Sequence, residues 1–334
     1  MDAIILVGGQ GSRLRPLTLT RHKSLVPVCN QPAIEYLFRW LAKHGIDRAV
    51  LALGQANEDL ADAYPAGRHH GLEIVPILET KRLESGGAIR NAVASTGIEG
   101  RFLVLNGDIF VDFNLAAALA DHEAHGADLT LALHRVADPS QFGVAVVDGE
   151  RMVTGFVEKP PLGSAPSNLV NAGVWIFEPG LVDEIPPGAV RVEETLFPSL
   201  VGRRRSVLGF EFEGLWADIG TPARYRDLNV ALARHAGAVA KDCTLGAGAA
   251  LELSVLGPGC AIGPRAAVLN SVLWERVHVG DDARITGSIL ADGVTVGAGA
   301  VVDRVVAGSG ATIAPHAVIP PGTNLEPGAR YDST

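Results

Sequence analysis

The sequence predicts an α/β domain followed by a second domain built from a short repeat. Aliphatic runs that suit buried strands alternate with segments of helical apolar spacing over roughly the first two thirds of the chain. From about Ala240 the composition shifts to small and aliphatic residues in a recurring pattern. Because 334 residues is long for a single domain, we predict two domains, 1–236 and 237–334.

The first domain is predicted from its alternating elements. The first strand is expected at 4–7, and the other strand-like runs are 49–53, 74–78, 102–105, 129–133 and 173–177. The helix-like runs are 33–44, 87–94 and 115–125. Such alternation predicts a mostly parallel sheet with helices on both faces. In folds of this kind ligands bind beyond the carboxyl ends of the strands.

Charge and composition exclude several classes of partner and location. The formal charge of −9 argues against nucleic acid as a partner, and no apolar run approaches the ~20 residues of a membrane span. The chain enters its first strand at once, which leaves no room for a signal peptide. Cys29, Cys243 and Cys260 lack metal-ligand spacing, so we expect reduced thiols and a cytoplasmic protein.

A glycine-rich turn follows the first strand. Gly8, Gly9 and Gly11 remove side chains that would keep a backbone away from a ligand, and Arg13 and Lys23 add two cations soon afterwards. This pattern predicts a phosphate-binding turn, although many such turns bind nothing. Its spacing is that of neither a P-loop nor a dinucleotide-binding fingerprint.

The longer string around this turn is more specific. It reads GGQGSRLRPLT from Gly8, and KSLVPV from Lys23. This string closely resembles the N-terminal motif of the sugar-1-phosphate nucleotidyltransferases, and residues 29–32 extend the likeness toward mannose-1-phosphate guanylyltransferases. One departure is His22, where the family usually has proline. The resemblance implies a Rossmann-like three-layer nucleotidyltransferase domain.

The resemblance also implies which residues hold the nucleotide. Arg13 and Lys23 would hold the triphosphate, and the stretch Glu84–Gly87 takes the place of a Gly-Thr-Ala-Gly segment that contacts the base. An ordinary tight turn is the alternative for that stretch. The residues that we expect to bind nucleotide are Leu6, Gly8, Gly9, Gly11, Ser12, Gln55, Ser85, Gly86 and Gly87.

Two aspartates are candidates for a metal site. Asp108 ends an apolar strand, and Asp218 is an isolated acid in a neutral stretch. Either could be a simple turn or capping residue. Both match the metal-binding aspartates of the family in local context, which implies Mg²⁺, a cation that prefers oxygen ligands.

Four further residues match the sugar-phosphate site of the family. Glu158 can accept hydrogen bonds from sugar hydroxyls, and Lys159 can meet a sugar phosphate. The asparagine matching Asn171 binds the sugar ring in the family. Gly143 would allow the sugar to come close to the backbone. A solvated surface pair is the alternative for Glu158 and Lys159. We assign no chemistry to His69 and His70, which are expected in a loop with nothing nearby to complete a metal site.

The second domain repeats every seventeen residues. The repeated aliphatic positions are Leu245, Ile262, Val279, Val296 and Ile313; then Leu251, Val268, Ile285, Val302 and Ile319; then Leu256, Leu273, Leu290 and Ala307. A period of 6+6+5 places one inward side chain on each face of a three-sided coil. The pattern resembles a left-handed parallel β-helix of the hexapeptide-repeat type. We expect this domain to serve homo-oligomerisation or regulation. The alternative is that this half of the chain is an acyltransferase.

Together these features lead to a functional hypothesis. The resemblance implies transfer of a nucleotide from an NTP to a sugar 1-phosphate, with GTP and mannose 1-phosphate as first choice. A heptose 1-phosphate comes second, and a UTP-, dTTP- or ATP-dependent glucose-1-phosphate enzyme is a further alternative. A catalytically silent sugar-nucleotide sensor is the alternative from another class.

Overall fold

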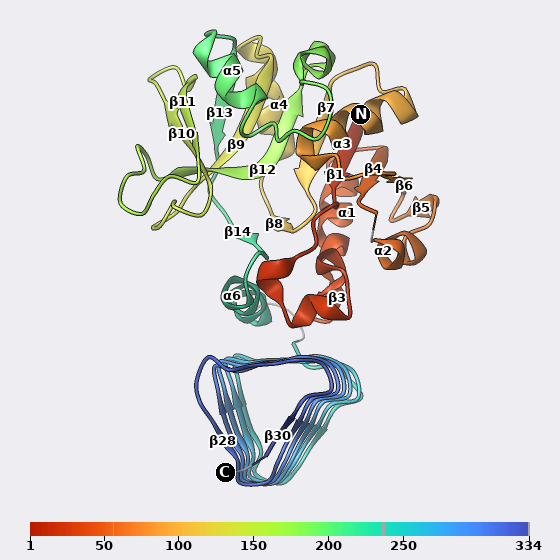
Figure 1. The fold of residues 1–334 in the computed structure, drawn as a ribbon, viewed down its shortest axis with the longest axis vertical. Coiled ribbons are helices and arrows are strands. Elements are labelled where there is room, and N and C mark those ends of the chain that lie inside the picture. The colour runs from red at the N-terminus through yellow and green to blue at the C-terminus, as the bar shows by residue number, and fades with distance from the viewer. Residues whose placement is uncertain (56, 235–237, 333–334) are drawn as a thin grey trace. The chain divides into compact units, whose positions relative to one another are not determined.

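The computed structural model describes residues 1–55, 57–234 and 238–332 (Figure 1). The chain divides into two compact units. The first, which we call the sheet unit, comprises Met1–Gly9 and Ile34–Trp216. The second, which we call the coil unit, comprises Gln10–Ala33 and Ala217–Thr334. Gly8 and Gly9 therefore belong to the sheet unit, whereas the rest of the glycine-rich segment, from Gln10 onward, belongs to the same unit as the C-terminal repeat. The expected domain boundary at 236/237 lies outside the described residues.

The centre of the sheet unit is the strand that precedes the glycine-rich turn. Strand β1 (Asp2–Leu6) pairs in parallel with β4 (Arg48–Leu53) and β7 (Phe102–Asn106). Strand β6 (Leu72–Leu78) adds to β4 in parallel, and β5 (Gly67–His69) closes that edge in antiparallel. Runs of aliphatic residues form these strands because both faces of the sheet are covered.

The other half of the sheet is largely antiparallel. Strand β12 (Leu169–Phe177) runs antiparallel to β7, β9 (Leu129–Arg135) and β10 (Gly143–Val147). Strand β11 (Val153–Glu158) pairs antiparallel with β10, and β13 (Val207–Glu211) pairs parallel with β9. The prediction of a mostly parallel sheet was therefore wrong for this half. The short connection 148–152 suits the antiparallel hairpin of β10 and β11, whereas β12 pairs with strands that lie further back in the chain.

Helices cover both faces of the sheet, as expected. Helix α3 (Glu84–Thr96) and helix α5 (Leu196–Gly202) pack into one core cluster with β1 and β12. The remaining helices and short elements of the sheet unit are α1 (Ala33–Lys43), α2 (Glu58–Ala63), α4 (Leu115–Ala124), β8 (Ile109–Val111) and η4 (Pro179–Glu184). The three helices expected from the sequence are thus confirmed.

The coil unit begins with short elements of the glycine-rich segment. These are η1 (Ser12–Leu14), η2 (Leu17–Leu19), η3 (Lys23–Leu25), β2 (Pro27–Val28) and β3 (Gln31–Pro32). After β14 (Trp216–Asp218), helix α6 (Pro222–Ala233) leads to the repeat. Residues 235–237 of the predicted linker lie outside the described residues.

The repeat forms three parallel sheets that Figure 1 shows as the sides of a triangle. The first side contains β15 (Thr244–Leu245), β18 (Ala261–Ile262), β21 (His278–Val279), β24 (Thr295–Val296), β27 (Thr312–Ile313) and β30 (Arg330–Tyr331). The second contains β16 (Ala250–Glu252), β19 (Ala267–Leu269), β22 (Arg284–Thr286), β25 (Val301–Asp303) and β28 (Val318–Ile319). The third contains β17 (Val255–Leu256), β20 (Val272–Leu273), β23 (Ile289–Leu290), β26 (Val306–Ala307) and β29 (Asn324–Leu325).

The register of these strands explains the seventeen-residue period. Val268 pairs with Ile285, and Ile285 with Val302, and all three side chains are fully buried. Each coil thus covers the apolar interior of the coil before it. Leu245 in the first coil is 52% exposed because no earlier strand of its face covers it. The predicted parallel β-helix is confirmed.

A buried ladder of serines joins successive coils. The backbone N–H of Ser271 donates to Oγ of Ser254, that of Ser288 to Oγ of Ser271, and that of Val305 to Oγ of Ser288. These hydroxyls satisfy backbone groups at one corner of the coil, where the strand ladder is interrupted.

Two findings concern the expected environment of the chain. Every helix in the described part of the chain is too short or too polar to cross a membrane. Cys29, Cys243 and Cys260 are all free thiols.

Candidate active site

Predicted site residues of the sheet unit lie at the ends of three neighbouring strands, at one edge of the sheet. Gly8 and Gly9 follow β1, Gln55 follows β4, and Asp108 follows β7. Because these strands are parallel neighbours, their carboxyl ends meet at the same edge. Leu6 is the last residue of β1 and therefore reaches this edge as well.

Glycines allow the turns at this edge to pack closely. A Cβ at Gly107 would lie 2.2 Å from Cγ1 of Val7, and a Cβ at Gly54 would lie 2.8 Å from the carbonyl oxygen of Gly8. The N–H of Gly107 donates to the carbonyl of Leu6 at 2.9 Å. Asp108 is therefore held directly beside the end of β1.

Gln55 and the second glycine pair already have protein contacts. The amide of Gln55 donates to the carbonyl of Thr80. Gly86 donates from its N–H to the carbonyl of Val190 at 2.8 Å, and a Cβ at Gly87 would lie 2.5 Å from the carbonyl of Gly188. These two glycines thus let α3 pack against the 185–192 segment. Their role in binding a base stays a prediction.

Ser85 lies within α3 and contacts a buried acid. Its Oγ donates to Oε2 of Glu193 at 2.6 Å and accepts from the N–H of Val192 at 3.0 Å. Burial raises the pKa of the Glu193 carboxyl. Ser85 therefore ties α3 to the same segment as its neighbouring glycines.

Glu158 and Lys159 form the centre of a charged group in the sheet unit. Gly143 pairs with Glu158 across β10 and β11, and a Cβ at Gly143 would lie 2.7 Å from Oε2 of Glu158. Nζ of Lys159 lies 3.0 Å from Oε1 of Glu158, and Nη2 of Arg191 lies 3.9 Å from the same oxygen. Because Gly143 has no side chain, the Glu158 carboxylate can occupy the space beside it.

Arg191 was not predicted from the sequence. It belongs to a stretch without a recognisable motif, and its position near Glu158 depends on folding over a long separation. Burial tends to lower the pKa of Arg191, but Glu193, Glu158 and Glu194 outweigh burial and raise that pKa overall. Arg191 thus adds a second cation beside the predicted sugar-phosphate residues.

Asn171 occupies a bulge at the start of β12. Its Oδ1 accepts hydrogen bonds from Nε1 of Trp175 at 2.7 Å and from the N–H of Gly173 at 3.1 Å. The pairing of β12 with β9 shifts register between Asn171 and Trp175. These two bonds fix the orientation of the Asn171 amide.

In the coil unit, the glycine-rich segment is a series of tight turns. Gly11 has a φ of 61°, a left-handed conformation that favours glycine, and it precedes η1, which carries Ser12 and Arg13. Oγ1 of Thr18 donates to the carbonyl of Gly11 at 2.8 Å, and a Cβ at Gly11 would lie 3.1 Å from Cβ of Lys23. Gly11 therefore brings the start of η1 close to Lys23.

His22 has a backbone conformation that a proline could also adopt. Its φ is −60°, the value that a proline ring would impose, and its Nδ1 accepts a hydrogen bond from the N–H of Ser24 at 3.2 Å. This side chain caps η3 immediately before Lys23.

Asp218 and Arg13 converge on Gly220. A Cβ at Gly220 would lie 2.6 Å from Oδ1 of Asp218 and 2.9 Å from Nη2 of Arg13. Oδ2 of Asp218 also pairs with Nη1 of Arg224 at 2.9 Å. One predicted metal ligand and one predicted triphosphate ligand thus lie together in the coil unit.

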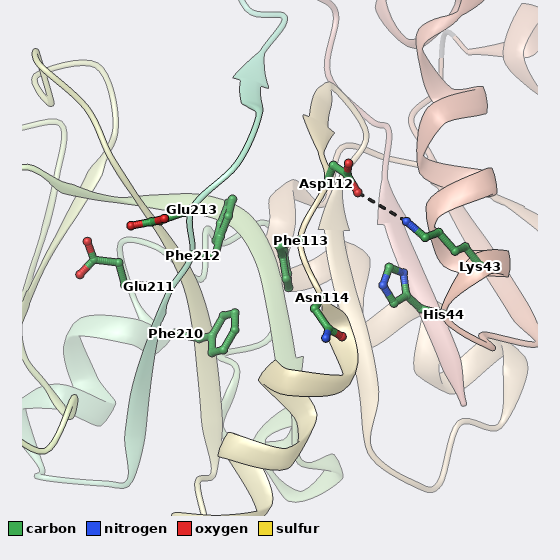
Figure 2. A pocket seen from close by; sticks show the side chains of 9 residues that line it. All are labelled: Lys43, His44, Asp112, Phe113, Asn114, Phe210, Glu211, Phe212 and Glu213. Carbon is green, nitrogen blue, oxygen red and sulfur yellow. Dashed lines mark ion pairs between the residues drawn. The ribbon is translucent and has the colours of Figure 1, made fainter.

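The structure also contains a pocket that includes none of the predicted site residues. This pocket of about 730 Å³ is lined by Lys43, His44, Asp112, Phe113, Asn114, Phe210, Glu211, Phe212 and Glu213 (Figure 2). Two of these residues form an ion pair, with Nζ of Lys43 3.8 Å from Oδ1 of Asp112. We assign the pocket no role in the reaction.

Comparison with known proteins identifies the family of each part of the chain. A family model described as "Nucleotidyl transferase" matches residues 2–235, and one described as "GlmU-like, C-terminal hexapeptide" matches residues 236–331. The second match agrees with the left-handed β-helix expected from the repeat.

Individual relatives agree with these models. The chain is 36% identical over 224 residues to a mannose-1-phosphate guanylyltransferase of Mycobacterium tuberculosis, covering 66% of this chain and 62% of the relative. It is also 36% identical over 231 residues to a mannose-1-phosphate guanyltransferase of Schizosaccharomyces pombe, covering 67% of this chain and 62% of the relative. The matched region thus spans less than two thirds of each relative.

A solved structure provides a further comparison. It is a crystal structure assigned as a glucose-1-phosphate thymidylyltransferase of Bacillus anthracis, in complex with sucrose. It superposes with a TM-score of 0.63 and 25% identity, covering 71% of this chain and 96% of that chain. Since one family model covers well over half of the chain, this protein belongs to the nucleotidyl transferase family.

Proposed function

We propose that the protein is a sugar-1-phosphate nucleotidyltransferase, and that its preferred reaction is GTP plus mannose 1-phosphate to GDP-mannose plus pyrophosphate. The observation that carries this proposal is the meeting of Arg13 and Asp218 at Gly220, within a segment that matches the family motif. The names of the relatives support the choice of GTP and mannose 1-phosphate.

The proposed reaction is a single displacement at phosphorus. A phosphate oxygen of the sugar 1-phosphate attacks the α-phosphate of the NTP, a P–O bond forms, and the bond to the β-phosphate breaks to release pyrophosphate. Catalysis of this type depends on positioning and on neutralising charge around the transferring group. Arg13 and Lys23 would hold the triphosphate and the departing pyrophosphate.

Asp108 and Asp218 fit the donor chemistry of a divalent metal. Both present carboxylate oxygens, which Mg²⁺ prefers, and a hydrogen-bonded arginine orients the Asp218 carboxylate. We propose that these two residues hold Mg²⁺. The bound ion would neutralise negative charge on the phosphate oxygens.

The sugar phosphate is assigned to the charged group of the sheet unit. Glu158 would accept hydrogen bonds from sugar hydroxyls, while Lys159 would steer the phosphate; Asn171 and Gly143 would contact the ring. Arg191 beside Glu158 extends this set. The nucleotide would contact Leu6, Gly8, Gly9, Gly11, Ser12, Gln55, Ser85, Gly86 and Gly87.

A single substrate assay distinguishes the proposed reaction from three alternatives. A heptose 1-phosphate could replace mannose 1-phosphate, and the Bacillus anthracis structure favours a glucose 1-phosphate with another NTP. A catalytically silent sensor is the alternative from another class. Its ligand would be a nucleotide sugar, and it would need no clamp for a leaving group.

The β-helix is proposed to assemble copies of the chain, because the paired strands β25 and β28 expose the apolar side chains of Val301 and Val318 on one side of it. We place the catalytic domain at 1–236 and the β-helix domain at 237–334. A cytoplasmic location is proposed from the free thiols.

The test is pyrophosphate release measured for GTP, UTP, dTTP and ATP, each with mannose, glucose and heptose 1-phosphates in the presence of Mg²⁺. We expect the highest kcat/KM with GTP and mannose 1-phosphate. Turnover with another pair would move the substrate assignment to that pair. No turnover with any pair, together with tight binding of a nucleotide sugar, would establish the sensor.

A further inference from the structure

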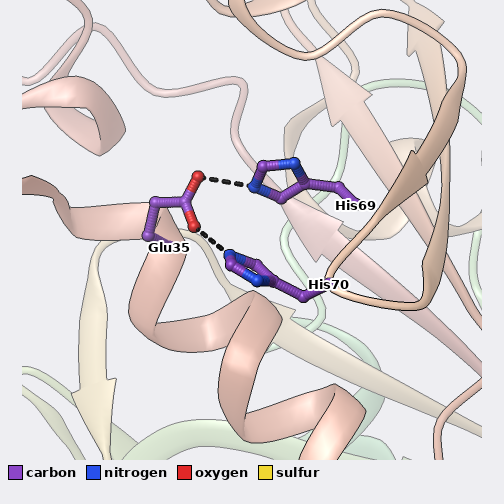
Figure 3. A group of neighbouring side chains, drawn as sticks. All are labelled: Glu35, His69 and His70. Atoms are coloured by element: carbon purple, nitrogen blue, oxygen red, sulfur yellow. Dashed lines mark hydrogen bonds and ion pairs between the residues drawn. The ribbon is translucent and has the colours of Figure 1, made fainter.

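A cluster of metal-ligating side chains lies on the sheet unit, apart from the residues proposed for catalysis. Glu35 comes from the first turn of α1, His69 ends β5, and His70 follows it in the chain (Figure 3). The sequence predicted nothing near the two histidines that would complete a metal site. Glu35 lies beside both of them, which corrects this expectation.

The three side chains point at one another. Nε2 of His69 lies 2.7 Å from Oε1 of Glu35, and Nε2 of His70 lies 2.6 Å from Oε2. The three atoms that could bind a metal all lie within 4.8 Å of one another. Within the described residues this is the one group of three or more His, Cys, Asp or Glu side chains with such spacing.

The backbone is shaped so that both rings reach the same carboxylate. Consecutive residues of a strand normally point to opposite faces of the sheet. His70 has a φ of 51°, a left-handed conformation that is uncommon for a residue with a side chain, and its ring centroid lies 4.4 Å from that of His69. The turn after β5 therefore directs both Nε2 atoms to Glu35.

The surroundings hold the carboxylate and the first ring in place. Tyr64 donates from its hydroxyl to Oε1 of Glu35 at 2.8 Å, and the edges of Phe38 and Tyr64 pack against the ring of His69. Burial raises the pKa of the Glu35 carboxyl, but hydrogen bonds from His70, Tyr64 and His69 outweigh burial and lower that pKa overall. The hydrogen bonds to Glu35 therefore fix the position of the carboxylate that would bind the ion.

The donor set selects the class of metal. Two imidazole nitrogens and one carboxylate oxygen suit Zn²⁺ and its first-row neighbours, whereas Mg²⁺ prefers oxygen ligands alone. In a tetrahedral zinc site with bonds of about 2.0–2.1 Å, the ligand atoms lie about 3.3 Å apart. The observed spacing reaches this arrangement through small movements of the two half-exposed histidines, whose side chains are each 38% exposed.

We propose that Glu35, His69 and His70 form a Zn²⁺ site that is separate from the proposed Mg²⁺ site, with water as the fourth ligand. The hydroxyl of Tyr64 would orient the carboxylate from outside the ligand set, as outer hydrogen bonds do in other zinc sites. The bound ion would fasten the β5–β6 edge of the sheet to α1.

Binding of Zn²⁺ to the full chain, measured by calorimetry in excess Mg²⁺, tests this proposal. We expect one Zn²⁺ per chain and a rise in Tm, because a ligand that binds only the folded state stabilises it. His69→Ala and His70→Ala should each abolish this binding. His278→Ala is the matched control, since His278 is an exposed histidine of the coil unit, and it should bind Zn²⁺ like the unaltered chain. Equal Zn²⁺ binding by His70→Ala and His278→Ala would overturn the proposal.

Co²⁺ substitution identifies the ligands independently. We expect visible d–d absorption without a thiolate-to-cobalt charge-transfer band. A charge-transfer band would assign the ion to one of the free thiols, Cys29, Cys243 or Cys260, and would refute the site. Tyr64→Phe keeps the packing and should weaken Zn²⁺ binding by about 10–100-fold, the usual effect of losing an outer hydrogen bond.

Discussion

The indole Nε1 of Trp274 donates a hydrogen bond of 2.8 Å to the hydroxyl of Tyr225, and both side chains are fully buried. The Tyr225 hydroxyl donates in turn to the carbonyl of Pro27. A coil of the β-helix is therefore connected through α6 to the segment that carries Arg13 and Lys23. The β-helix is part of the scaffold of that segment.

Other contacts of the coil unit support this connection. Nη2 of Arg21 pairs with Oδ2 of Asp292 at 2.9 Å, and its guanidinium lies 5.0 Å from the centre of the Trp274 ring. The N–H of Cys29 donates to Oδ1 of the buried Asn229 at 2.8 Å. The glycine-rich segment is thus held by both α6 and the repeat.

Tyr225→Phe should lower both stability and turnover. The change leaves Nε1 of Trp274 and the carbonyl of Pro27 without this partner, which we expect to cost about 1–3 kcal/mol in the free energy of unfolding. Denaturant unfolding and pyrophosphate release measure the two effects. Tyr331→Phe, at the end of the repeat, is the control. If Tyr225→Phe matches Tyr331→Phe in free energy of unfolding and in turnover, the connection contributes to neither.

Gly220→Ala should reduce turnover while keeping the fold. The added Cβ would stand within 3 Å of both Asp218 and Arg13, so the two side-chain ends must move apart. A misplacement of this size in a reacting site can cost about 10²-fold in rate. Gly202→Ala, which meets nothing within 4 Å, is the matched control. Full activity in Gly220→Ala would show that the convergence at Gly220 is not needed.

Glu193→Gln should change how stability depends on pH. Burial raises the folded-state pKa of Glu193, so its contribution to stability is fully present below its unfolded pKa and is lost as pH rises through the folded pKa. The variant, which carries no charge here, should therefore gain stability over the unaltered chain between a pH below the ordinary glutamate pKa of 4.5 and a pH well above it. Thermal unfolding at both values measures this gain. Glu194→Gln, at the exposed neighbouring position, is the control. If the stability of Glu193→Gln and that of the unaltered chain change with pH in the same way, burial of the Glu193 charge does not affect stability.

Ser271→Ala should destabilise the β-helix. Its Oγ accepts from the N–H of Ser288 and donates to the carbonyl of Leu269, so removal leaves a buried N–H unsatisfied at a cost of about 1–3 kcal/mol. Ser309→Ala is the control: Ser309 is half-buried, and its hydroxyl makes only a solvent-exposed hydrogen bond with Thr20, so its loss should change the free energy of unfolding by less than about 0.5 kcal/mol. Unfolding in urea compares the two, and similar stabilities would rule out the ladder as a stabilising feature.

The sequence predicted what depends on local patterns. The inward positions of the β-helix follow from a regular period, so the spacing alone placed Val268 and Ile285 in its interior. Gly8 and Asp108 could likewise be assigned to strand ends, because a buried strand and the residue after it are adjacent in the chain.

Contacts between distant segments could not be predicted in this way. Glu35 reads as a polar residue in the first turn of a helix, and nothing in its neighbourhood indicates His69 and His70. Arg191 has no motif around it, and the contact of Trp274 with Tyr225 depends on how the repeat packs on α6. The antiparallel half of the sheet was missed because apolar runs do not reveal strand direction.

The most direct test of the proposed chemistry is the rate of pyrophosphate release from GTP and mannose 1-phosphate by Asp108→Asn, compared with Asp112→Asn. Asp112 is a nearby exposed acid that lines the pocket outside the proposed site, and its variant should turn over like the unaltered chain. Asp108→Asn should lose at least about 10²–10³-fold in kcat with an unchanged Tm, because it removes a carboxylate proposed to hold Mg²⁺, the ion that would neutralise charge on the phosphate oxygens. Turnover by Asp108→Asn at the rate of Asp112→Asn would contradict the assignment.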